Sequence, residues 1–200
     1  SKFNVDFGEL NADADAKVRF AEDDANLLDK LRAADAALTA GDSAAGAGAL
    51  QASAGARNPA ELLDQLHTRL ATANREWLRG FLDKGGLKLA AGVARRRLCR
   101  DPLGAADART VASALKCFKA VCNNAEGLGR FADTPHALDA LAGCLEPGTV
   151  LADARGPALD VLCVAVWASD AARCAVLASL DRLARHRLEM PFAWAAAFLE

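Results

Sequence analysis

The stretch Asp107-Ala-Arg-Thr-Val-Ala-Ser-Ala-Leu-Lys-Cys-Phe-Lys-Ala-Val-Cys-Asn-Asn124 decides the fold that we expect for this chain. Its apolar residues Val111, Leu115 and Phe118 recur at about the 3.6-residue period of a helix, and basic residues occupy the other side. The closing pair of asparagines ends the pattern, because asparagine hydrogen-bonds to nearby backbone and favours helix ends. The stretch therefore predicts one helix with a buried face.

Helical patterns continue on both sides of this stretch, separated by glycine, proline, asparagine or aspartate. We predict further helices at residues 59–73, 75–82, 87–99, 135–145, 153–168, 170–187 and 192–199, with a short turn at 128–132. We expect Asn58 and Thr134, each followed by a proline at the first helical position, to cap the helices that begin there. In the helices at 153–168 and 170–187 we expect the inward side chains to be Leu159, Leu162, Cys163, Val166, Val176, Leu177, Leu180 and Leu183. No run alternates polar and apolar residues as a strand would.

Helical pairs of this length cannot bury both of their apolar faces alone, which indicates units that stack on one another. We therefore predict an all-α, armadillo-like right-handed superhelical stack of helical hairpins. We place this stack at residues 59–200, after a small N-terminal helical subdomain at 1–39 and an Ala/Gly/Ser-rich linker at 40–58. The chain ends inside an apolar stretch, so we expect it to be a truncated part of a longer protein.

Composition excludes several classes of protein. The hydrophobic content of 52% suits a domain with a continuous core, and the net charge of -2 gives no overall attraction to nucleic acid. No apolar run approaches the roughly 18 residues that a transmembrane helix needs. We therefore expect a cytoplasmic protein without a transmembrane segment.

Catalytic and metal-binding patterns are missing from the sequence. It contains no CxxC pair, no glycine-rich phosphate loop, no GxSxG or HExxH motif and no tyrosine, and its three histidines lie far apart. The cysteines fall mostly on predicted apolar faces, as reduced core thiols do. The arginines Arg95 to Arg97 suit the end of a helix dipole better than an anion site. We expect no catalytic residues, no metal and no cofactor.

Three segments resemble successive parts of the regulatory N-terminal region of formins. They are Asn74-Arg-Glu-Trp-Leu-Arg-Gly-Phe-Leu-Asp-Lys-Gly-Gly-Leu87, Ala114-Leu-Lys-Cys-Phe-Lys-Ala-Val-Cys-Asn-Asn-Ala-Glu-Gly-Leu128 and Leu159-Asp-Val-Leu-Cys-Val-Ala165. The middle segment is the most specific. The resemblance runs from about Pro59 to the end of the chain, and residues 1–39 resemble the GTPase-binding subdomain more weakly. The first segment departs from the family, which has more asparagines before its tryptophan.

The resemblance implies a regulatory binding module that controls actin filament assembly, associated with the cytoskeleton. It implies that the GTP form of a Rho-family GTPase contacts Asn74, Asn123 and Asn124. It also implies that a C-terminal autoregulatory helix of the same protein binds in a groove. The groove residues that the resemblance implies are Leu128, Phe131, Leu138, Ala158 and Leu162. Actin would be affected indirectly, through the rest of the protein.

Each of these residues also has a plain structural explanation. Asparagine at a helix terminus is ordinary capping, and the aliphatic residues of the groove could equally be core. The rival function is a generic armadillo-type scaffold, such as a cytoskeletal or ciliary adaptor, without GTPase binding. The sequence leaves open whether the stack forms a homodimer.

Overall fold

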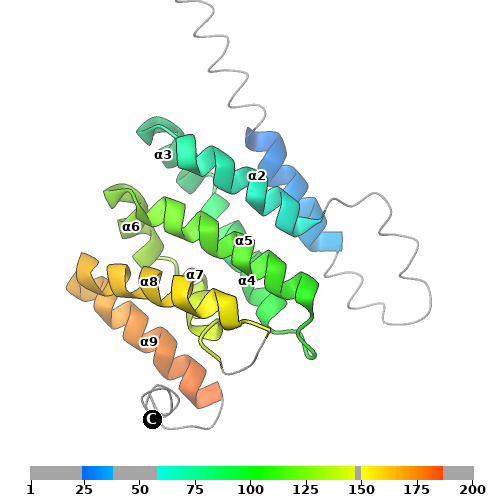
Figure 1. Cartoon of the computed structure of the whole chain (residues 1–200). Coiled ribbons are helices and arrows are strands. Elements are labelled where there is room, and N and C mark those ends of the chain that lie inside the picture. Colours follow the sequence, from blue (N-terminus) through cyan, green and yellow to red (C-terminus); the bar gives the residue numbers. More distant parts are fainter. Residues whose placement is uncertain (1–23, 38–57, 147–149, 187–200) are drawn as a thin grey trace, which may run out of the picture. The chain divides into compact units, whose positions relative to one another are not determined.

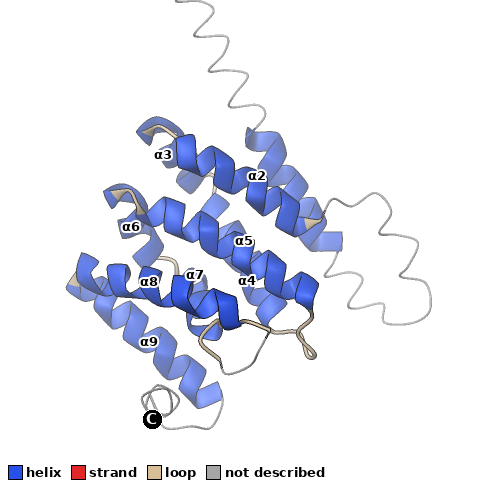
Figure 2. Ribbon diagram, viewed as in Figure 1, coloured by secondary structure: helices blue, strands red, loops and turns tan. Residues whose placement is uncertain are grey.

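The computed structural model describes residues 24–37, 58–146 and 150–186, and every regular element in these ranges is a helix (Figure 2). The chain divides into two compact units, residues 1–56 and 57–200. In the first unit, residues 24–37 form a helix whose side chains Leu27, Leu28 and Leu31 are buried. The predicted helix at 192–199 and most of the predicted subdomain and linker lie outside the described residues.

The second unit contains eight described helices (Figure 1). They are α2 (Pro59–Thr72), α3 (Arg75–Asp83), α4 (Gly86–Leu98), α5 (Ala105–Cys122), α6 (Ala125–Ala132), α7 (Pro135–Gly143), α8 (Ala152–Ala168) and α9 (Asp170–His186). The long helices α2, α5 and α8 lie side by side, and the short helices α3 and α6 follow α2 and α5. This arrangement confirms an all-α, armadillo-like fold.

Helix α5 is the centre of the packing, as the quoted stretch predicts. It contacts α2, α4, α6 and α8. Its residues Val111, Ala114 and Phe118 are fully buried, and the Phe118 ring meets that of Phe131 edge-on at 5.5 Å between centroids. Such aromatic pairs add about 1 kcal/mol to the stability that burial of the rings gives. The predicted helix therefore joins two successive layers of the stack.

Two predictions about local structure are wrong. Residues 128–132 are the second half of helix α6 and not a turn, because Gly127 and Gly129 lie within the helix instead of ending it. Thr134 precedes Pro135 as expected, but its hydroxyl donates to the Arg130 carbonyl at 2.8 Å and does not cap α7. The capping prediction for α2 is confirmed, since the Ala60 backbone N–H donates to Asn58 Oδ1 at 3.0 Å.

An ion pair in the interior joins the end of α4 to the start of α5. Arg97 is 5% exposed, and its Nη1 donates to Asp107 Oδ1 at 3.2 Å. Arg100 donates to the same oxygen at 3.3 Å, and the other carboxylate oxygen of Asp107 accepts the Gly104 backbone N–H. The three arginines lie in the last turn of α4 as expected, and Arg97 among them is a buried structural residue.

Helix α6 approaches α5 so closely that only glycine fits at position 127. A Cβ atom there would lie 2.1 Å from the Val121 carbonyl oxygen. We expect Gly127→Ala to destabilise the chain by about 1–3 kcal/mol in urea unfolding, as overpacking does. Gly129→Ala in the same helix is the matched control, because nothing lies within 4 Å of its added Cβ. Equal stability of the two variants would contradict this close approach.

Candidate functional site

Two asparagine side chains begin the short helices at one edge of the stack. Asn74 caps α3 by accepting the Trp77 backbone N–H at 2.8 Å, and Asn124 caps α6 by accepting the Glu126 backbone N–H at 2.9 Å. Asn74 and Asn123 are exposed, and Asn124 is half-buried. The turn that joins α2 to α3 and the turn that joins α5 to α6 thus present polar side chains on the same edge (Figure 1).

A hollow of about 500 Å³ lies between the ends of α2 and α5. Asn123 and Asn124 line it together with Ala73, the neighbour of Asn74, but Asn74 itself is not among the lining residues. The remaining lining residues are His67, Leu70, Ala71, Leu78, Lys116, Lys119 and Ala120. The structure therefore brings two of the three predicted contact residues into one hollow and places the third beside it.

Two lysines and no carboxylate line this hollow, so its wall is basic. The carboxylates that meet the lysines lie outside it. Lys116 Nζ is 3.3 Å from Asp64 Oδ1 of α2, and Lys119 Nζ is 3.9 Å from Asp160 Oδ2 of α8. These pairs are exposed and contribute little to stability. A partner can therefore offer its own acidic or carbonyl oxygens to the lysines at small cost.

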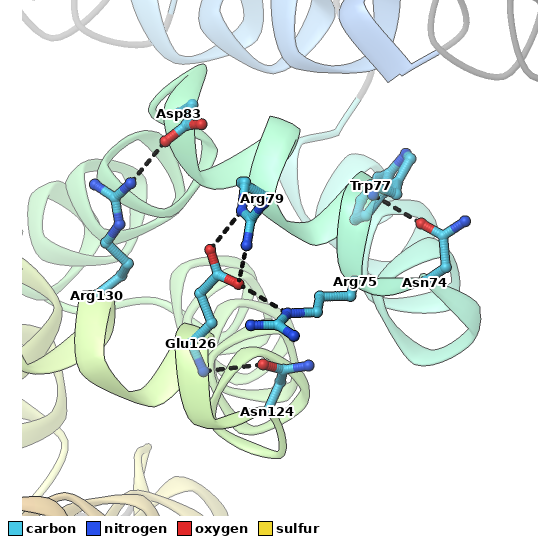
Figure 3. A network of polar contacts seen from close by, with 8 residues as sticks. All are labelled: Asn74, Arg75, Trp77, Arg79, Asp83, Asn124, Glu126 and Arg130. Atoms are coloured by element: carbon cyan, nitrogen blue, oxygen red, sulfur yellow. Dashed lines mark hydrogen bonds and ion pairs between the residues drawn. The ribbon is translucent and has the colours of Figure 1, made fainter.

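A cluster of ion pairs, shown in Figure 3, connects the two turns. Glu126 of α6 accepts from Arg79 Nε at 2.8 Å and from Arg75 Nε at 3.3 Å, and both arginines belong to α3. Arg130 of α6 reaches back to Asp83 of α3 at 2.7 Å. We call these five residues the α3–α6 clasp. Because Arg75 follows Asn74 and Glu126 follows Asn124 by two residues, the clasp fixes the relative position of the two caps.

The arginines change the acidity of Glu126. The hydrogen bond from Arg79, with the weaker one from Arg75, lowers the pKa of Glu126 to about 2. A depressed carboxyl pKa means that the ionised form is favoured in the folded chain. Glu126 is therefore ionised at neutral pH, and the stability that its ion pairs contribute is lost as pH falls from the unfolded pKa, about 4.3, toward 2.

The residues expected to line a helix-binding groove are mostly core. Phe131, Leu138 and Ala158 are each 0% exposed, Leu162 is 4% exposed, and Leu128 is half-buried. None of the four buried side chains is accessible to an incoming helix in this structure.

Helix α8 is rotated relative to the expectation from its sequence. Its inward residues are Ala154, Ala158, Val161, Leu162 and Ala165. Leu162 is buried as expected, whereas Leu159 (46% exposed) and Cys163, also expected to face inward, are exposed. Val164 is 47% exposed. In α9 Val176 is buried as expected, whereas Leu177 is 47% exposed. We call Leu159, Cys163 and Val164 the α8 stripe, an apolar surface beside the face of α5 that carries Lys119.

The described residues hold no other chemical site. No group of three or more histidine, cysteine or acidic side chains among them is placed to bind a metal ion. Burial raises the pKa values of the Cys122 and Cys144 thiols to about 12, so both stay protonated and unreactive. Cys99, Cys163 and Cys174 are exposed, which corrects the expectation that most cysteines are core. None of the described helices has the length and hydrophobicity to cross a membrane.

Sequence reasoning missed the clasp and the two lysines of the hollow. The signal for the clasp was weak: Arg75 and Arg79 are four residues apart, so they lie on one face of α3. Their partner Glu126 is 47 residues away from Arg79 in sequence, and no local pattern connects the two. Lys116 and Lys119 were visible as the polar side of α5, but the hollow beside them depends on how α2 packs.

Comparison with family models matches residues 15–164 to the Diaphanous GTPase-binding domain. The match covers the helix at 24–37, both asparagine turns, the clasp and most of α8. A search of curated proteins finds no match to the chain.

The pKa of Glu126 can be measured directly. In a titration followed by NMR of the side-chain carboxyl carbon, we expect Glu126 to show a pKa of about 2. Arg79→Gln should raise this pKa toward the ordinary glutamate value of about 4.3, because it removes the stronger hydrogen bond. Arg185→Gln near the end of α9 removes an exposed charge whose partner is Asp181, outside the clasp, and should leave the pKa of Glu126 unchanged. A pKa near 4.3 in the unmodified chain would contradict the clasp.

Proposed function

Because the chain belongs to the Diaphanous GTPase-binding domain family, the regulatory N-terminal region of formins, we propose that its asparagine edge binds the GTP form of a Rho-family GTPase. We define the asparagine edge as Asn74, Asn123, Asn124 and the hollow beside them. The family is one of regulatory binding domains and not of enzymes. The proposal concerns which surface of this chain makes the contact.

The proposal rests on one observation: Asn123 and Asn124 line the same basic hollow, next to the turn that contains Asn74. Asparagine side chains both donate and accept hydrogen bonds, so they can pair with the backbone of a partner loop. Lys116 and Lys119 attract acidic groups and favour fast association with an acidic partner. The α3–α6 clasp holds the edge in one geometry, which reduces the entropy lost on binding.

We further propose that the α8 stripe, with the adjacent face of α5, receives an amphipathic helix, the C-terminal autoregulatory helix of the same protein. Exposed Leu159 and Cys163 are four residues apart and so lie on one face of α8, and exposed Val164 borders Cys163 on the side away from Leu159. Amphipathic helices bind to such strips through residues at i, i+3, i+4 and i+7. Binding of this helix would restrain actin filament assembly by the rest of the protein.

Substitution of Asn124 tests the GTPase contact. Aspartate caps helices as well as asparagine does, so Asn124→Asp should leave helicity and stability unchanged. It removes the amide N–H donors and adds a negative charge in the hollow. We expect at least about tenfold weaker binding of Rho-family GTPases loaded with a non-hydrolysable GTP analogue, measured by calorimetry.

Asn58→Asp is the matched control. Asn58 caps α2 with the same hydrogen bond, 3.0 Å from Ala60 N to Asn58 Oδ1, but lies at the far end of that helix, about 20 Å from the edge. The affinity of the Asn58→Asp chain for the GTPase should equal that of the unmodified chain. Equal affinity of the Asn124→Asp chain would remove this residue from the contact. A chain that binds none of the GTPases in either nucleotide state would support the scaffold alternative.

The helix-binding surface has its own test. Val164→Asp places a charge in the α8 stripe at an exposed position, so the chain should fold normally. We expect it to weaken binding of an amphipathic peptide from the C-terminal region of the same protein by at least tenfold, because the charge would be buried without a partner. Ala158→Asp is less informative, since a charge at this 0% exposed position should unfold α8. Unchanged peptide affinity of Val164→Asp would place the helix elsewhere.

A further inference from the structure

Helix α8 ends in an exposed aromatic residue that neither proposed surface explains. Trp167 is 85% exposed, well above the exposure of any other large apolar residue in the described parts of the second unit. It lies one turn beyond the α8 stripe, at the end of the helix. An indole in water exposes a large apolar area, and tryptophan is enriched at protein interfaces relative to the rest of the surface.

The repeat of the fold shows which position Trp167 occupies. Five buried residues of α8 have the same spacing as five buried residues of α5. Those of α8 are Ala154, Ala158, Val161, Leu162 and Ala165, and those of α5 are Thr110, Ala114, Cys117, Phe118 and Val121. When these two sets are placed in register, Trp167 coincides with Asn123. We number the turns that join α2 to α3, α5 to α6 and α8 to α9 as the first, second and third turns. Trp167 therefore occupies at the third turn the position that Asn123 occupies at the second.

The third turn belongs to the same edge of the stack as the first two. Ser169 caps α9, one residue later in this register than Asn124 caps α6, and its Oγ accepts the Ala172 backbone N–H at 3.0 Å. Helix α6 contacts both α3 and α9. In Figure 1 the ends of α2, α5 and α8 lie on one side of the stack, each followed by a sharp change of direction. The three turns thus form a row.

The row has the dimensions of one protein interface. Neighbouring packed helices are about 8–10 Å apart, so the three turns span roughly 20 Å. A standard interface covers about 800 Å² on each partner, a patch roughly 28 Å across, so one partner can cover all three turns. Tryptophan is the residue most enriched among those that carry binding energy, usually in combination with surrounding polar contacts. Asn123 and Asn124 supply such polar groups on the adjoining turn.

We propose that Trp167 is an apolar anchor of the same GTPase contact, extending the asparagine edge to the third turn. This inference rests on the proposed function, since it names a further residue for that partner. The indole would be buried against an apolar surface of the GTP-loaded GTPase, while the amides of the first two turns fix orientation. Trp167 follows Val164 by three residues and Cys163 by four, so it also adjoins the α8 stripe, and its register with Asn123 is the reason for assigning it to the GTPase.

The test compares variants of the whole 200-residue chain. Calorimetry measures the affinity of each variant for a GTPase that binds the unmodified chain and is loaded with a GTP analogue. The variants are Trp167→Ala, Trp167→Phe and Asn124→Asp. We expect Trp167→Ala to weaken binding at least about tenfold and Trp167→Phe to retain most of the affinity, since a second aromatic ring fills much of the same space. Val150→Ala is the control: Val150 is also exposed, but it precedes α8 and lies about 25 Å from the third turn.

Failure of this inference can be told apart from failure of the proposed function. If Trp167→Ala binds as the unmodified chain does while Asn124→Asp is weakened, the contact ends at the second turn and the inference is overturned alone. If neither substitution changes the affinity, both the inference and the proposed site are overturned. Loss of peptide binding with unchanged GTPase binding in Trp167→Ala would assign the indole to the helix-binding surface and would also overturn the inference.

Discussion

The capping hydrogen bonds of Asn74 and Asn124 are the interaction on which the asparagine edge depends. A helix start leaves backbone N–H groups without partners, and a side-chain oxygen at the cap satisfies one of them. Each asparagine thereby fixes the residue at which a short helix begins, immediately after a long helix has ended. The chain must change direction there, so the two turns, the hollow and the α3–α6 clasp all lie where these caps place them.

Close packing around α5 imposes the second constraint. Helices α2, α4, α6 and α8 all contact it, and contact on this scale requires small residues at the points of nearest approach. Gly127 meets the Val121 carbonyl, and three of the five buried residues of α8 are alanines. Leu159 and Val164 lie off this buried face of α8, which is why they are exposed.

The sequence was sufficient for features that depend on local signals. Periodicity located every described helix of the second unit except α6, and the Asn58 cap followed from its position before Pro59. Helix α6 was missed because glycines at 127 and 129 resemble breakers, although the first is needed for close approach. The inward face of α8 was missed because this helix has apolar residues on nearly all sides, so its periodicity gives no direction. The partners of Glu126 come from another layer and depend on the assembled stack.

Lys119 belongs to both proposed surfaces, which links them physically. It lines the hollow beside Asn123 and Asn124, and its Nζ lies 3.9 Å from Asp160 on α8, next to Leu159. A ligand that draws Lys119 into the hollow weakens this exposed ion pair and alters the charge beside the α8 stripe. Any such effect must be reciprocal, because the free energy of coupling between two binding sites is the same from either side. An exposed pair of this kind is worth at most about 1 kcal/mol, so Lys119 alone can change affinity by no more than about fivefold. A stronger coupling between the two ligands would require direct overlap or movement of α5, and the dense packing around α5 opposes such a movement.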